Sequence, residues 1–235
     1  MMRRYFQLGL AATALAALAA GTALAAPIEM TVSSDGTTVN GLTFYQTAST
    51  AGYANADFMG WDIYTVLTGN SNSPSLTPFG LSLSGTVAAC TNATGCDPLT
   101  VSLSDVGFTA PASSFATAMT DIQTGTGTVT QQAYYDLTNG YFGMGGSIAG
   151  AGNPLSLSAT GSMTGTGGGP VSGGPYSLTL VQTFNTSCTM AGCTSFTVGG
   201  NITGATVPEP GTLALFGASL LGLGLFMRRR AVRQS

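Results

Sequence analysis

Carboxylates are the side chains outside the two ends of this 235-residue chain that could carry acid–base chemistry, because the sequence contains no histidine and no lysine. A serine or cysteine nucleophile needs a neighbouring base, most often histidine. Glycoside hydrolysis needs only two carboxyl groups at a suitable separation, and Asp57 and Asp62 form the pair best placed for it. No cation accompanies them to orient a substrate. We therefore expect no enzymatic activity and keep a carboxylate-dependent glycoside hydrolase as an alternative.

Aromatic residues around the same carboxylates indicate a second chemistry, the binding of sugars. An aromatic face stacks on a sugar ring while a neighbouring Asp or Asn side chain hydrogen-bonds to the sugar hydroxyls. The competing interpretation is that these rings fill the core of the fold. The candidate carbohydrate-binding residues are Tyr45, Tyr53, Trp61, Tyr64, Asp57 and Asp62.

The four cysteines occur in two similar segments, and each segment is expected to form the tip of a β-hairpin. Opposed positions on antiparallel strands bring side chains within disulfide reach, which predicts the bridges Cys90–Cys96 and Cys188–Cys193. Pairings between the two segments are also allowed, and a four-thiolate zinc site is the competing interpretation. Export to an oxidising compartment favours disulfides, so we expect no metal and no cofactor.

The distribution of charge excludes nucleic acid as a partner. Eight of the nine carboxylates lie between Pro27 and Thr206, a region without a single cation, and the ninth is Glu209. Such a surface repels phosphates, and its side chains form no internal salt bridges. Stability must come from apolar burial, backbone hydrogen bonds and cross-links. The cations all lie near the ends of the chain: Arg3, Arg4, Arg228, Arg229, Arg230 and Arg233.

Apolar and hydroxyl residues alternate along much of the chain, a pattern typical of half-buried antiparallel strands. The predicted fold class is all-β, an antiparallel, jelly-roll-like β-sandwich of about nine or ten strands. Between residues 26 and 206, a helix is expected only over residues 112–122, and the glycine-rich residues 164–175 are expected to form a loop. The expected strands cover residues 30–33, 39–47, 58–67, 81–89, 99–104, 127–132, 134–148, 155–158, 176–184 and 196–206.

The N-terminal residues have the composition of a signal peptide. Two arginines precede an alanine-rich apolar run from Leu8 to Leu24. The small residues Ala23 and Ala25 fit the signal peptidase, so we predict cleavage after Ala25.

The C-terminal residues combine a proline motif, an apolar run and an arginine cluster. Val-Pro-Glu-Pro-Gly at 207–211 is followed by an uncharged run over 212–227 and by arginines within 228–233. A helix over that run is about 24 Å long, short against a hydrocarbon core of about 30 Å, so it needs snorkelling arginines or local thinning to span. The positive-inside rule keeps the arginines in the cytoplasm and places the upstream chain outside.

This order of features resembles the sorting signal of PEP-CTERM proteins, a tail also catalogued as the ice-binding-protein C-terminal domain. In that family an integral-membrane, cysteine transpeptidase-like enzyme, exosortase, recognises the tail and cuts near the Pro-Glu-Pro. The resemblance implies that Pro208, Glu209 and Pro210 are a recognition motif, and therefore a substrate rather than an active site. The two prolines also hold an extended backbone that does not continue the helix.

Three regions are therefore expected: a signal peptide over 1–25, a β-rich exterior domain over 26–206 and a sorting tail over 207–235. The expected route is transient anchoring in the inner membrane with the domain in the periplasm, then surface display or secretion. The resemblance implies a non-enzymatic structural protein of the extracellular polysaccharide or biofilm matrix, with a carbohydrate-binding module or glycoside hydrolase as alternatives. Its expected partners are the signal peptidase, an exosortase-type enzyme, the membrane and exopolysaccharide.

Overall fold

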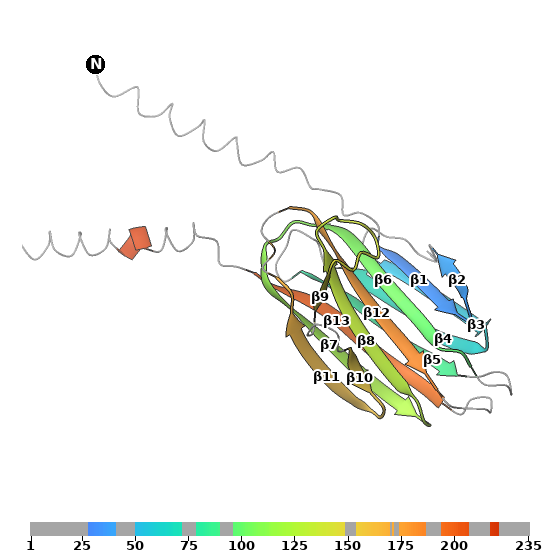
Figure 1. The fold of residues 1–235 in the computed structure, drawn as a ribbon. Helices are drawn as coiled ribbons and strands as arrows, with labels where there is room; N and C mark the ends of the chain where they lie inside the picture. Colours follow the sequence, from blue (N-terminus) through green and yellow to red (C-terminus); the bar gives the residue numbers. More distant parts are fainter. Residues whose placement is uncertain are drawn as a thin grey trace, which may run out of the picture.

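Two antiparallel β-sheets packed face to face form the described part of the protein (Figure 1). The computed structural model describes residues 28–40, 50–71, 79–89, 96–148, 154–169, 171, 174–186, 194–206 and 217–220. The arrangement confirms the predicted all-β class and antiparallel sandwich. Sheet A contains, in spatial order, β10 (Leu155–Leu157), β8 (Thr128–Asp136), β12 (Tyr176–Asn185), β6 (Leu99–Phe108), β1 (Glu29–Ser34) and β2 (Thr37–Asn40), with β9 (Gly146–Ile148) also on β8. Sheet B contains β11 (Gly161–Gly167), β7 (Ala112–Thr124), β13 (Thr194–Thr206), β5 (Gly80–Ala89), β4 (Trp61–Ser71) and β3 (Thr50–Phe58).

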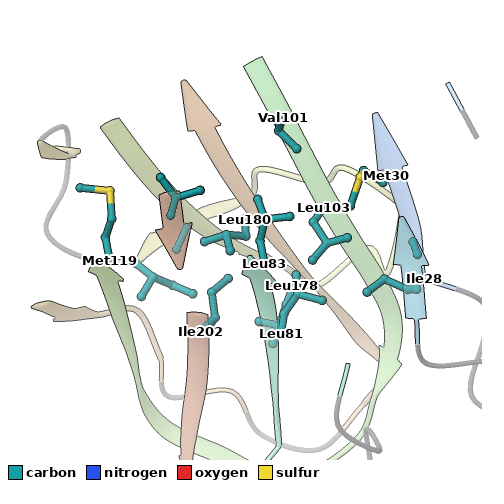
Figure 2. Close-up of a cluster of buried hydrophobic side chains, with 14 of the residues drawn as sticks. Ile28, Met30, Leu81, Leu83, Val101, Leu103, Met119, Leu178, Leu180 and Ile202 are labelled. Atoms are coloured by element: carbon teal, nitrogen blue, oxygen red, sulfur yellow. The ribbon is translucent and has the colours of Figure 1, made fainter. Parts of the chain in front are cut away.

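The core lies between the sheets and is built from the apolar residue of each alternating pair. In β6, Leu99, Val101 and Leu103 are fully buried, whereas the two residues between them are partly exposed. Figure 2 shows buried side chains from β6 together with those of β12, β5 and β1. Burying one such side chain contributes about 1.5–3 kcal/mol, so the core is the main source of stability in a domain without cations.

The chain changes sheets at both cysteine segments, which corrects the predicted hairpins. β5 pairs with β4 and β13 in sheet B, whereas β6 pairs with β1 and β12 in sheet A, and β12 and β13 are divided in the same way. Two strands that bury the same core from opposite sheets show the same alternation as two paired strands, so the pattern could not tell them apart. The β5–β6 and β12–β13 connections both lie at the same end of the sandwich. At that end Ala89 pairs with Thr194, and Leu99 pairs with Phe184.

β7 occupies the segment predicted as a helix. Phe115, Met119 and Asp121 are buried on one face, whereas Ile122 on the other face is 64% exposed. Alanines at alternate positions favour a helix locally. Pairing with β11 on one side and β13 on the other overrides that preference.

Three other predicted boundaries differ from the structure. Residues 58–67 contain a turn at Met59 and Gly60, which both have positive φ and separate β3 from β4. Residues 134–148 are interrupted by turns between β8 and β9. The glycine-rich residues 164–167, expected to be part of a loop, belong to the regular strand β11.

Buried polar side chains cross the interior of the sandwich. Gln182 Nε2 donates to Gln131 Oε1 at 2.9 Å, and Gln131 Nε2 donates to Thr117 Oγ1 at 2.8 Å. Thr117 Oγ1 in turn donates to the Asn201 carbonyl at 2.7 Å. Asp121, on the same face of β7, is 1% exposed, and neither of its carboxylate oxygens has a hydrogen-bond partner. Burial raises the pKa of Asp121 to about 6.

The predicted terminal features fall outside the described residues. This applies to the signal peptide with Ala23 and Ala25, and to the Pro-Glu-Pro motif at 208–210. In the described ranges, no helix is both long and apolar enough to cross a membrane. The last strand, β13, ends at Thr206, next to the residue that begins the proline motif.

Candidate functional site

Two of the predicted sugar-stacking residues lie in the core. Trp61 has no exposed surface, and its Nε1 donates a 2.8 Å hydrogen bond to the Asp97 carbonyl oxygen. Its ring lies 6.4 Å, centroid to centroid, from each of Phe184 and Phe196. Tyr53 is 5% exposed. Neither ring offers a face to a sugar, which corrects the expectation that they form a binding surface.

The two carboxylates of the predicted cluster lie on either side of the β3–β4 turn. Asp57 is exposed, and its backbone N–H donates to Asn55 Oδ1 at 3.0 Å. Asp62 is half-buried on β4. Tyr45 and the side chain of Tyr64 lie outside the described residues. Among the described members of the cluster, the carboxylates are therefore the ones that reach solvent.

Cys96 takes part in a disulfide, and its partner lies outside the described residues, as do the other three cysteines. The Cys96 sulfur lies 3.4 Å from the Gly60 carbonyl oxygen. The next residue, Asp97, accepts hydrogen bonds through its carbonyl from Trp61 and, at 3.4 Å, from Ser34 Oγ. The predicted pairings, including Cys90 and the Cys188–Cys193 bridge, stay predictions. The described part of the chain holds no group of three or more His, Cys, Asp or Glu side chains suited to a metal.

A surface loop between β8 and β9 brings together aromatic and polar side chains that the sequence does not predict to form a site. We call residues 137–145 the aromatic loop, because Tyr141 and Phe142 lie at its centre. Asn139 reaches from the loop to β6, where its Oδ1 accepts a 2.7 Å hydrogen bond from the Gly107 N–H. The Phe142 N–H donates to Ser104 Oγ at 2.9 Å. The loop therefore folds back over the end of sheet A (Figure 1).

The loop's backbone is unusual for residues other than glycine. Asn139 has φ 57° and Phe142 has φ 55°. Asn tolerates the left-handed region, but a bulky residue there costs about 1–3 kcal/mol. Such strain persists only where surrounding contacts hold it, and it concentrates at binding sites. The Ser104 and Gly107 hydrogen bonds are contacts of this kind.

The loop exposes large apolar side chains to solvent. Leu137 is 66% exposed and Met144 is 56% exposed. The rings of Tyr141 and Phe142 are half-buried and lie 6.5 Å apart between centroids. An exposed apolar group of this kind in an ordered loop is a typical binding feature.

Two carboxylates influence the tyrosine of the loop electrostatically. Burial, followed by the charges of Glu29 and Asp105, raises the pKa of Tyr141. The Tyr141 hydroxyl therefore stays protonated at neutral pH. At the start of the loop, Asp136 accepts from the Thr138 N–H at 2.9 Å through Oδ1.

The outer face of sheet A continues from the loop as an uncharged polar floor. Residues directly opposite each other on paired strands share a face. The row beside the loop contains Glu29, Ser104, Thr179 and Tyr134, and the rows beyond it contain no charge. Apart from Val181 they are polar: Thr31, Ser102, Val181 and Gln132, and then Ser33, Thr100, Thr183, Thr130 and Ser156.

This arrangement suits a neutral, hydroxyl-rich ligand. The rings can stack on the apolar face of a sugar, while carboxylates, hydroxyls and an amide satisfy its hydroxyl groups. An anionic polymer would meet carboxylates and no cation. The sequence contains a turn signal for the loop, Asn139-Gly140, although the residues around it also predict a strand over 134–148.

Comparison with known proteins identifies the C-terminal tail. The described part of the chain is an antiparallel β-sandwich with an aromatic surface loop, and a distinct segment follows it. Residues 206–230 match the PEP-CTERM protein-sorting motif. The chain thus carries the sorting signal of PEP-CTERM proteins, and Pro208, Glu209 and Pro210 lie within the matched residues. No curated protein matches the chain.

Several solved structures share a weak likeness with the chain. The carbohydrate-binding module TmCBM61, solved with β-1,4-galactotriose, is 10% identical over 64% of this chain and 92% of its own, with a TM-score of 0.28. The CBM22-1 xylan-binding domain from Paenibacillus barcinonensis is 10% identical over 68% of this chain and 94% of its own, with a TM-score of 0.29. At such TM-scores the likeness supports no conclusion about this chain.

Proposed function

We propose that this protein is an exported, non-enzymatic β-sandwich that associates with neutral extracellular polysaccharide through the aromatic loop and the outer face of sheet A. The observation that carries the proposal is the exposed loop of Tyr141 and Phe142, which stands beside Glu29 and an uncharged polar floor. This face points away from the core, which lies between the two sheets.

The sorting signal supports the location that this function requires. In the PEP-CTERM family the tail directs export and processing by exosortase, which would bring the domain to the cell surface or the surrounding matrix. The route in the proposal is signal peptidase cleavage, passage through the inner membrane, and tail processing after Thr206. A domain without cations is well suited to a neutral matrix, because it is not bound by anionic polymers.

Affinity electrophoresis through gels that contain neutral exopolysaccharide tests the proposal. The full chain should be retarded in a solubilising detergent, and Tyr141→Ala should lose up to about tenfold in affinity, because ring stacking contributes on the order of 0.5–1.5 kcal/mol. The matched control is Ile122→Ala, which removes a 64% exposed apolar side chain from the outer face of sheet B. Equal retardation of wild type and Tyr141→Ala would contradict the proposed role of the aromatic loop in polysaccharide binding.

The absence of catalysis is tested on the same material. Incubation of the protein with the polysaccharide should release no reducing sugar. Release that disappears in the double variant Asp57→Asn, Asp62→Asn would replace the binding function with hydrolysis by that carboxylate pair.

A further inference from the structure

β11 forms a free edge of sheet B. Among the described strands it is hydrogen-bonded only to β7, and the other edge of this sheet is β3 (Figure 1). Its seven residues pair with β7 from Gly161 opposite Asp121 to Gly167 opposite Phe115, without a register shift. All seven are exposed or half-exposed. One side of the strand therefore presents a regular row of backbone N–H and C=O groups.

This edge has none of the protections that sheet edges usually carry. Natural edge strands are shortened, bulged, charged or interrupted by proline, which prevents pairing with another chain. β11 reads Gly-Ser-Met-Thr-Gly-Thr-Gly, with no charge and no proline. By contrast, β3 contains two register shifts and Asp57, β2 has four residues, and β9 and β10 have three each. Among the described edges, β11 is the one that combines seven regularly paired residues with no charge, no proline and no register shift.

Charge restricts which partner can pair with this edge. The region between Pro27 and Thr206 carries eight carboxylates and no cation, so most contacts between two copies would place like charges together without compensation. β11 is an uncharged stretch on this anionic domain. It can approach an identical edge without such a cost.

We propose that β11 pairs antiparallel with β11 of a second copy of this chain, joining two sheets B into one continuous sheet. In the register centred on Thr164, that residue lies opposite its own copy, and Ser162 lies opposite Thr166. Met163 lies opposite Gly165, which leaves space for the longer side chain. Hydroxyls thus meet hydroxyls on the outer face, and no pair includes a charge or two large side chains.

The pairing goes beyond the proposed sugar binding and does not depend on it. The aromatic loop lies over sheet A, so it stays accessible when two sheets B join. Two loops on one dimer would raise the avidity for a polymer that presents many copies of the same unit. The association should strengthen with added salt, because salt screens repulsion between the two anionic domains.

Sedimentation velocity of the full chain in a density-matched non-ionic detergent tests the pairing. Wild type should form a dimer whose fraction rises with protein and salt concentration. Thr164→Asp places two carboxylates directly opposite each other and should weaken the dimer by about tenfold or more. The matched control is Thr203→Asp, which adds the same charge at an exposed position of β13, an internal strand, and should leave the dimer as in wild type. Circular dichroism confirms that both variants fold.

A photo-crosslinking amino acid at Ser162 of the full chain, in host membranes, identifies the partner. It should yield a product of twice the chain mass, and the same group at Thr203 should not. A monomer at every concentration, equal effects of the two Asp substitutions, or a crosslink at Ser162 to a different protein would each overturn the proposal. Loss of polysaccharide retardation with the dimer intact would contradict only the proposed function.

Discussion

The β3–β4 turn region and the aromatic loop contain similar residues but use them in opposite ways. Near the turn, Trp61 points into the core and is fully buried between Phe184 and Phe196. In the loop, Tyr141 and Phe142 lie on the outer face of sheet A and remain partly exposed. Aromatic residues beside carboxylates are therefore an ambiguous signal. The face of the strand or loop on which each ring lies decides whether it stabilises the fold or can bind a ligand.

Substituting one ring in each region distinguishes a core ring from a surface ring most clearly. The largest effect on stability is expected at Trp61. Trp61→Ala should lower the free energy of unfolding by about 3–5 kcal/mol, because it leaves a cavity and removes the donor to the Asp97 carbonyl. Tyr141→Ala should change it by about 1 kcal/mol or less. Urea denaturation measures both. Similar losses of stability in the two variants would mean that the loop ring is a core residue.

Carboxylates, like the aromatic rings, occur both in the core and on the surface, and Asp121 is the buried one whose pKa is raised. Asp121 is buried with a pKa of about 6, above its ordinary value of 3.8, so the folded state binds its proton more tightly than the unfolded state. Stability should therefore fall as the pH rises from about 4 to 6. Above that range the ionised group costs up to about 3 kcal/mol. Asp121→Asn should raise the unfolding free energy at pH 8 by up to that amount and leave it unchanged at about pH 4, as urea denaturation at the two pH values would measure.

The control for this pH dependence is Asp57→Asn, which removes a carboxylate from the surface. Its effect on stability should be small at both pH values. A pH-independent effect of Asp121→Asn would show that Asp121 gains a compensating partner, such as a cation or water, in solution.

The sequence allowed the sheets to be predicted better than the site. Alternation identified β1, β5, β6, β10, β12 and β13, because each places apolar side chains from alternate positions in the core. It could not assign strands to sheets, so β5 and β6 were expected to be a hairpin. It also failed at Asn139 and Phe142, whose positive φ depends on Gly107 and Ser104, residues that are 32 and 38 positions away. Contacts of that range leave no local pattern.

Asn139 provides the finest test of how the loop differs from the core region, because its side chain ties the loop to β6. Asn139→Ala removes the acceptor for the Gly107 N–H. It also places an alanine, which tolerates positive φ less well than asparagine, at φ 57°. We expect a loss of about 1–2 kcal/mol and weaker polysaccharide retardation. Asn139→Gly also lacks the acceptor, but glycine adopts the positive φ without strain. This variant should therefore retain more stability and more polysaccharide retardation than Asn139→Ala. Hydrogen exchange at the Gly107 amide should speed up in both variants, since each leaves that N–H unbonded. Unchanged exchange would show that the loop is held by Ser104 and the backbone of Phe142 alone.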